Sequence, residues 1–466
     1  MQTEAHQQES VTDAPSPAAP SNESYAKSAR VLTIGIASTG LFTFLYLAVA
    51  SHELSPPAYS RISLCFAVMY VIVSVIYRPI EQLLSRTIAD RRARGVHGHP
   101  LWIPATIQLG FAMLFLAIAL ALRPQIEQGM FDGSSVLYWV LVIGTLAYAA
   151  SYFARGWLGG HQRFDLYGGL VFLESSSRFL LALAVAIGIG SGQNVVALGM
   201  LVAPFASLCV IPFAFSRVPT HGGTAEFQIA DAAREGPAHA EIEEAAADLT
   251  LRYGTGFAVS VVGIMLAEQT LMNAGVLVVA ASTGGSITTG LTGFVFNVLL
   301  IVRAPLQLFQ AIQTAILPHL ARLEAHDSAD EFGRAIRATI LLIVAFAGTC
   351  AIVLLLVGPA LMTALLGHKH FVYGRWGLAL VAVGMGFHLV SGTLNQAALA
   401  RGRAAVASVS WLFAAAIFVA FVAAPTIPNE VTRVEVGYFM ASALLCGLLT
   451  VVYKWRPTAA PATATG

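Results

Sequence analysis

Twelve long apolar runs determine what this chain can fold into. A helix needs roughly 20 apolar residues to cross about 30 Å of hydrocarbon, and the runs have about this length or more. The sequence therefore predicts an all-α, polytopic membrane protein with about 12 transmembrane helices. The runs occupy residues 30–51, 62–80, 101–122, 134–154, 166–189, 194–215, 254–280, 287–315, 337–358, 376–399, 404–424 and 434–453.

Composition excludes the soluble classes of protein. Of the 466 residues, 57% are apolar and 11% are charged, whereas soluble domains have about 45–50% and about 25%. So few charges exclude a soluble enzyme, a nucleic-acid-binding protein and a disordered scaffold, and the net charge of +1 indicates no polyanionic partner. The cysteines lie in apolar runs without metal or disulfide spacing. We expect no metal, no cofactor and four buried thiols, at Cys65, Cys209, Cys350 and Cys446.

The basic residues predict the orientation. Cytoplasmic loops are enriched in Lys and Arg, and with the N-terminus inside, 19 of the 26 Lys and Arg residues, Arg155 among them, fall on inner segments. We therefore predict cytoplasmic termini in a bacterial plasma (inner) membrane. Residues 1–29 and 457–466 are predicted to be disordered cytoplasmic tails, and the first has no signal-peptide pattern. The outer segments hold Arg61, Arg123, Lys369, Arg375 and Arg433.

An internal repeat divides the chain into halves. Residues 216–252 carry seven carboxylates and are predicted to form an acidic cytoplasmic linker, with some helix, between six-helix lobes at 30–215 and 253–456. Six spans per lobe give a parallel repeat around a central cavity, and such repeats place the substrate site between the halves. A shift of 225 residues aligns Val73, Ile76, Arg78, Gln82 and Leu83 with Val298, Ile301, Arg303, Gln307 and Leu308.

Arg178 is the most deeply placed charge in a predicted span. At about 1.5 Å per residue it lies roughly 18 Å from the start of its span, and Glu174 precedes it by one turn on the same helix face. Charges at this depth are costly and usually functional. Two interpretations follow: a self-neutralising pair that lets the helix insert, or a pair that lines a hydrated cavity and exchanges partners with an anionic substrate.

Arg78 and Arg303 occupy equivalent positions in the two halves. Either could extend its guanidinium group to the lipid headgroups, although apolar sequence continues well beyond Arg303. Alternatively, the repeat places one guanidinium group on each side of a central cavity, where the two could hold a diphosphate bidentately. The candidate substrate-binding residues are Arg78, Arg178, Arg303, Glu174, Gln82 and Gln307.

Four further polar residues lie within predicted spans. His388 could titrate near neutral pH and Glu268 could carry a coupling proton, so both are candidates for ion coupling. The alternative is a hydrogen bond to a neighbouring helix, and it applies equally to Asn297 and Asn395.

Four stretches follow one another along the chain in a recognisable order. They are RGWLGGHQRFDLYGGLVFLESSSR (155–178), APLQLFQAIQTAILPHLARL (304–323), GPALMTALLGHKHFVYGRWGLALVAVG (358–384) and NQAALARGR (395–403). Together they resemble the oligosaccharidyl-lipid flippases of the polysaccharide-export family, which belongs to the multidrug/oligosaccharidyl-lipid/polysaccharide (MOP) superfamily. In span 7, where relatives often carry an acidic residue after an asparagine, this chain has Asn273 followed by alanine and glycine.

The resemblance implies a transporter whose two lobes alternate between inward-open and outward-open states. It would flip a polyprenyl-diphosphate-linked oligosaccharide from the inner to the outer leaflet for cell-envelope polysaccharide assembly. By this analogy Arg78, Arg178 and Arg303 bind the diphosphate while the lipid tail stays in the bilayer. Expected partners are the lipid-linked glycan and membrane lipids, with a glycan polymerase or glycosyltransferases as further candidates. No nucleic acid is expected, and the transporter would act as a monomer.

Three alternatives come from other classes. An ion-coupled drug or metabolite antiporter, MATE-like or of the major facilitator type, would use Glu174. The facilitator loop motif is only partly matched by ADRRARG (89–95), the loop after span 2, because Arg86 stands where that motif has glycine. A membrane glycosyltransferase would need acidic residues in large outer loops. The outer loops of this chain are short and the sequence has no Asp-x-Asp motif, so we expect no enzyme.

The third alternative is a scaffold that helps to assemble a polysaccharide machine. It would leave the intramembrane arginines without a role.

Overall fold

The structure is a computed structural model that describes residues 22–93, 101–215, 237–282, 289–303, 305–306, 329–367 and 371–454. In these ranges the secondary structure is helical, and ten helices are long and apolar enough to cross a membrane. The predicted all-α, polytopic fold is thereby confirmed. Its elements are α1 Asn22–Glu53, α2 Pro56–Ala93, α3 Trp102–Ala121, the π-helix η1 Gln125–Met130, α4 Ser135–Gly160, α5 Phe164–Ala186, α6 Gly192–Leu208, α7 Ile211–Phe215, α9 Pro237–Ser282, the helix Leu291–Arg303, α12 Ala329–Leu366, α13 Arg375–Ala400, α14 Ala404–Ala423 and α15 Glu430–Lys454.

Each predicted span overlaps one of these helices, and three segments differ in detail from the predicted boundaries. The run 194–215 is divided into α6 and α7, because Pro212 has no N–H with which to continue the hydrogen-bond ladder. The run 287–315 begins in the helix Leu291–Arg303 and continues outside the described residues. The predicted linker contains the start of α9, which begins at Pro237 and runs without interruption through span 7.

The helices α2 and α4 extend further than predicted. The segment 89–95 was expected to be a loop, but α2 continues to Ala93. The segment after span 4 was also expected to be a loop, whereas α4 continues to Gly160 and keeps Arg155 inside the helix. The glycines allow this, because a Cβ at Gly160 would lie 2.6 Å from Ile88 Cβ and one at Gly156 would lie 2.9 Å from the Glu81 carbonyl oxygen. The last turns of α4 therefore pack closely against α2.

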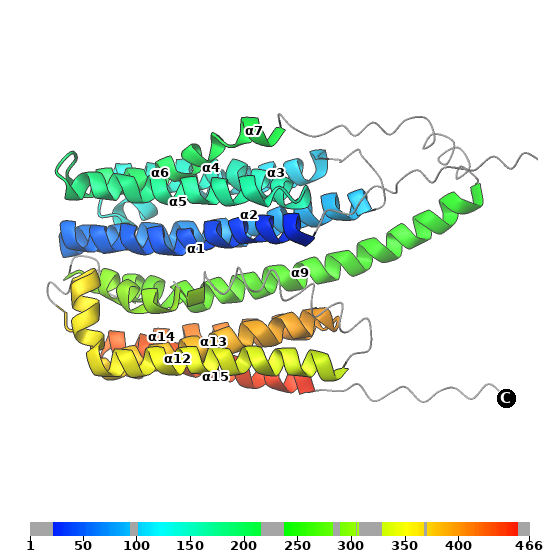
Figure 1. Cartoon of the computed structure of the whole chain (residues 1–466). Helices are drawn as coiled ribbons and strands as arrows, with labels where there is room; N and C mark the ends of the chain where they lie inside the picture. Colours follow the sequence, from blue (N-terminus) through cyan, green and yellow to red (C-terminus); the bar gives the residue numbers. More distant parts are fainter. Residues whose placement is uncertain are drawn as a thin grey trace, which may run out of the picture.

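The two halves repeat the same pattern of helix packing. In the first half α5 packs against α1 and α6, and α4 packs against α6 and α3. In the second half α14 packs against α9 and α15, and α13 packs against α15 and α12. These pairs are equivalent by the order of the helices within each half, which supports a parallel repeat. Figure 1 shows helices α1–α7 on one side of the molecule and α12–α15 on the other, with α9 between them.

The lobes meet mainly through α2, which contacts α9, and α1 contacts α12. One large cluster of buried apolar residues includes members from both halves. Only one cysteine fits the prediction of buried thiols: Cys65 is buried, Cys350 and Cys446 are half-buried, and Cys209 is exposed. The prediction was wrong because the lipid-facing surface of a membrane protein is as apolar as its interior, so an apolar run does not imply burial within the protein.

Candidate functional site

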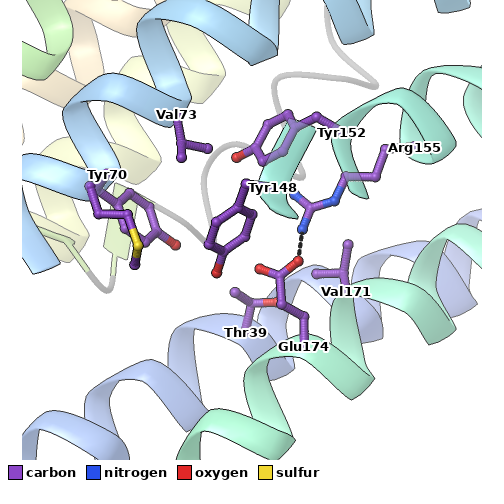
Figure 2. A pocket seen from close by; sticks show the side chains of 9 residues that line it. Thr39, Tyr70, Val73, Tyr148, Tyr152, Arg155, Val171 and Glu174 are labelled. Atoms are coloured by element: carbon purple, nitrogen blue, oxygen red, sulfur yellow. Dashed lines mark hydrogen bonds and ion pairs between the residues drawn. The ribbon is translucent and has the colours of Figure 1, made fainter. Parts of the chain in front are cut away.

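A small cavity lies in the first lobe among α1, α2, α4 and α5. Its volume is about 40 Å³, which is large enough for water but not for an organic substrate. Figure 2 shows the Glu174 carboxylate, the Arg155 guanidinium group and the Tyr148 hydroxyl directed toward one another. The cavity is lined by Thr39, Met69, Tyr70, Val73, Tyr148, Tyr152, Arg155, Val171 and Glu174.

Glu174 is the centre of a buried charge network. Its Oε2 accepts hydrogen bonds from Arg155 and, at 3.3 Å, from the Ser151 hydroxyl. Its Oε1 pairs with Arg178 Nη2 at 3.5 Å, so the predicted i,i+4 ion pair is present. Ser207 donates to Ser151 at 3.0 Å and extends the network to α6. A buried carboxylate is tolerated only when it is paired and hydrogen-bonded, and here two arginines satisfy it.

Arg178 is held by groups from three other helices. It is 0% exposed and donates to the Tyr148 hydroxyl at 2.6 Å and to Thr43 Oγ1 at 3.4 Å. Its guanidinium carbon lies 5.6 Å from the centre of the Phe66 ring on α2, within the range of a cation–π interaction. The Glu174–Arg178 pair of the first interpretation is therefore present, and Glu174 also lines a small cavity. The exchange of partners with an anionic substrate stays a prediction.

Arg303 in the second lobe has a different environment. Its Nη2 donates to Asn273 Oδ1 at 2.6 Å and to the Met272 carbonyl oxygen at 3.1 Å. Its guanidinium group lies 4.5 Å from the centre of the Phe296 ring. No ion pair joins Arg303 to a carboxylate among the described residues, and its Nε has no hydrogen-bond partner there. Asn273, which stands before the position where flippases often carry an acid, thus holds this arginine with a neutral amide.

Aromatic rings connect the two arginines across the lobe boundary. The Phe66 ring on α2 meets the Phe296 ring edge to face, with centroids 5.8 Å apart and planes at 83°. Tyr70 stacks on Phe66 at 4.7 Å and interacts electrostatically with both Arg178 and Arg303. We call Phe66, Tyr70 and Phe296 the aromatic seam. It brings the buried cations of the two lobes to opposite sides of a single contact.

The remaining predicted substrate-binding residues lie further along α2. Arg78 is half-buried and interacts electrostatically with Glu268 of α9 and with Glu81, while Gln82 is exposed. Arg78 and Arg303 are therefore related by the repeat but not equivalent in charge balance. Gln307 lies outside the described residues.

The predicted coupling residues have different surroundings. His388 is buried on α13, with Nδ1 3.2 Å from the Tyr438 hydroxyl of α15 and its ring edge to face with Trp411. This agrees with the simpler interpretation of a hydrogen bond to a neighbouring helix. Glu268 is half-buried and interacts electrostatically with Arg78 and Tyr438, so it connects the two lobes. Asn395 accepts from Trp411 Nε1 at 3.2 Å.

Sequence reasoning missed Arg155, Tyr148 and Tyr70. Arg155 was assigned to an inner loop. When it is left out of the count, the basic residues still lie mainly on the inner segments. The apolar Trp157 and Leu158 that follow it could have indicated a longer helix. The two tyrosines carry no comparable signal, since tyrosine is common in spans. Among the described residues, no group of three His, Cys, Asp or Glu side chains is arranged to hold a metal ion.

The backbone has the same overall fold as solved structures of MATE transporters. A mutant of the Vibrio cholerae MATE transporter VcmN aligns with a TM-score of 0.58 and 13% identity over 92% of this chain and 96% of that one. The eukaryotic MATE transporter AtDTX14 aligns with a TM-score of 0.61 and 12% identity over 92% and 95%. An inward-facing multidrug resistance MATE transporter of the MOP superfamily gives 0.55 and 14% over 92% and 93%.

These likenesses establish the fold. No protein-family model matches the chain, and a search among curated proteins finds no significant relative in sequence. The expected fold of two helical lobes is confirmed, because it is the fold of solved MATE transporters. Membership of the polysaccharide-export family stays a prediction.

Proposed function

We propose that this protein is an alternating-access membrane transporter of the MOP superfamily that flips a polyprenyl-diphosphate-linked oligosaccharide from the inner to the outer leaflet. The observation that carries this proposal is the unbalanced Arg303, which is buried at the lobe boundary among neutral partners. A diphosphate cannot cross hydrocarbon unaided because burying unpaired charge is prohibitive. A guanidinium group can hold it bidentately.

The arrangement also supports selection by charge. Arg303 and Arg178 approach the aromatic seam from opposite sides, so when the lobes separate both cations would face the opened path. A cationic substrate would be repelled from that path, whereas a diphosphate would be attracted. Arg178 keeps Glu174 as its counterion, and Arg303 is therefore the principal anion-binding group.

The test is a leaflet assay in proteoliposomes that contain a fluorescent polyprenyl diphosphate, with an impermeant quencher outside. Replacing Arg303 removes a charge-assisted interaction, so Arg303→Ala should slow flipping about 10- to 100-fold. Arg303→Lys should recover part of the rate because the charge remains and the planar fork is lost. The matched control is Arg123→Gln, an exposed arginine paired with Glu127, which should flip like the wild type. Equal rates for Arg303→Ala and the wild type would refute the proposed site.

A second candidate, an ion-coupled drug or metabolite antiporter, is favoured by two observations. The fold is that of solved MATE transporters, and Glu174 is a carboxylate that lines a cavity in the first lobe. This candidate expects efflux of a cationic dye that is lost in Glu174→Gln while Arg303→Ala still transports. Energy coupling in either case is assigned to Glu268, which connects the lobes, and Glu268→Gln should abolish any dependence of the rate on an ion gradient.

A further inference from the structure

The two lobes make an unusually close contact at the end of the boundary where α1 ends and α2 begins. Gly290 precedes the helix Leu291–Arg303 and has φ +89°, and a Cβ there would lie 2.5 Å from Pro56 Cβ. A Cβ at Gly293 would lie 2.7 Å from Tyr59 Cδ1. Glycine at both positions permits this close approach, because a larger residue at either one would force Pro56 or Tyr59 to shift.

Buried hydrogen bonds join the lobes at the same place. The Gly293 N–H donates to Ser60 Oγ at 3.0 Å. The Tyr59 hydroxyl donates to Asn297 Oδ1, and Asn297 Nδ2 donates to the Tyr373 hydroxyl at 3.2 Å. Tyr59 and Ser60 belong to α2 of the first lobe, whereas the other three groups belong to the second lobe.

Two further contacts reinforce this end. Phe294 packs against the rings of Phe371 and Tyr373, with centroids 5.1 Å and 4.6 Å away, so the segment before α13 covers the hydrogen bonds. At the end of α12, a Cβ at Gly367 would lie 3.8 Å from the Ser51 carbonyl oxygen of α1. At this end, α1 and α2 of the first lobe therefore contact three segments of the second lobe: the helix Leu291–Arg303, the end of α12 and the segment before α13.

The position of this contact relates it to the arginines. Tyr59 precedes Phe66 by seven residues, which places it on the same face of α2 about 10 Å along the helix. Asn297 follows Phe296 directly. The hydrogen-bonded group thus lies next to the aromatic seam, between the seam and this end of the molecule, and it must be opened before the seam can be reached from that side.

We infer that Tyr59, Ser60, Gly293, Asn297 and Tyr373 form a releasable latch that closes one end of the transport path. By the predicted topology this is the extracytoplasmic end. Hydrogen bonds suit such a role because water replaces them on opening, so each one shifts the equilibrium between closed and open forms by only about 2- to 10-fold. The inference rests on the alternating-access part of the proposed function and is independent of the substrate.

The latch can be tested by pulsed EPR distances in nanodiscs without any substrate. Spin labels at Gln128→Cys and Thr426→Cys, both exposed, report the separation of the lobes at this end in a background without native cysteines. Tyr59→Phe removes the donor to Asn297 and should raise the ratio of the long-distance to the short-distance population about 2- to 10-fold. Gly293→Ala acts by steric contact, because its methyl group would push against Tyr59. It should also raise the ratio of the long-distance to the short-distance population.

Matched controls separate the latch from general loosening. Tyr138→Phe removes a buried hydroxyl that donates to the Ala119 carbonyl oxygen within the first lobe, and Gly110→Ala adds a methyl group that meets no atom within 4 Å. Neither control should change the distances. Unchanged distances in both Tyr59→Phe and Gly293→Ala, or equal shifts in the controls, would overturn the latch. Because no substrate is present, that result would leave the assignment of Arg303 untouched.

Discussion

Arg178 in the first lobe and Arg303 in the second are both buried, yet their charges are balanced differently. Arg178 pairs with Glu174, and Arg155 pairs with the same carboxylate. Arg303 is held by an amide, a backbone carbonyl and an aromatic ring. A paired arginine contributes to the structure of its lobe, whereas an arginine among neutral groups remains available to an anion. Under the proposed function, the arginine of the first lobe is structural and the arginine of the second lobe binds the anion.

The largest effect is expected from Glu174→Gln, which leaves Arg155 and Arg178 without their carboxylate. Removing one member of a buried ion pair lowers the free energy of unfolding by about 3–5 kcal/mol. Thermal unfolding of the purified protein in detergent should show a large fall in midpoint. The control Glu127→Gln, whose carboxylate pairs with exposed Arg123, should cost about 0–1 kcal/mol. Equal shifts in the two variants would contradict the network.

Direct comparison of Arg178→Met with Arg303→Met should give the next largest difference. Removing Arg178 takes away the charged donor to Tyr148 and one of the two charged donors to Glu174, which keeps Arg155. Hydrogen bonds to charged groups contribute about 1.5–3 kcal/mol each. Removing Arg303 also eliminates an uncompensated buried charge, which offsets the lost bonds. Arg178→Met should therefore be the less stable protein by about 2 kcal/mol in the same unfolding measurement. If Arg303→Met were the less stable variant, the proposed difference between the two arginines would be contradicted.

Asn273→Asp would make the second lobe resemble the first by giving Arg303 a carboxylate partner. The fold should be retained because the two side chains have nearly the same shape. The paired arginine would bind a diphosphate less well, and flipping in the proteoliposome assay should fall about tenfold, which corresponds to about 1.4 kcal/mol. Asn273→Ala leaves Arg303 without a carboxylate partner and serves as the control. Wild-type flipping by Asn273→Asp would show that the charge of Arg303 is not what binds the substrate.

The smallest effect is expected from His388→Leu. This change removes one hydrogen bond, to Tyr438, together with a buried Nε2 that has no partner among the described residues. The lost hydrogen bond destabilises the protein by about 1 kcal/mol, and removal of the unpartnered Nε2 stabilises it by about as much. The free energy of unfolding should therefore change by less than about 1 kcal/mol, and the flipping rate should stay within about twofold of the wild type. Strong loss of flipping at unchanged stability would instead restore an ion-coupling role to His388.

The candidate site shows how far sequence reasoning reaches. Arg178, Glu174 and Arg303 could be found because charged residues within long apolar runs stand out against a uniform background. Arg155 could not be found in the same way, because it follows an apolar run and its helical state depends on glycines that pack against α2. Tyr70 and Phe66 acquire their importance only from contact with the other lobe.

The sequence by itself determined the membrane class, the approximate spans, the division into two halves and the presence of buried charge. These are properties of local stretches, since the length of an apolar run and a charge within it need no partner to be recognised. The tertiary structure decided which arginine pairs with a carboxylate, which polar groups form the latch and where the lobes meet. Those outcomes depend on the rotation and approach of helices far apart in the chain, as between Tyr59 and Asn297, and no local pattern encodes that geometry.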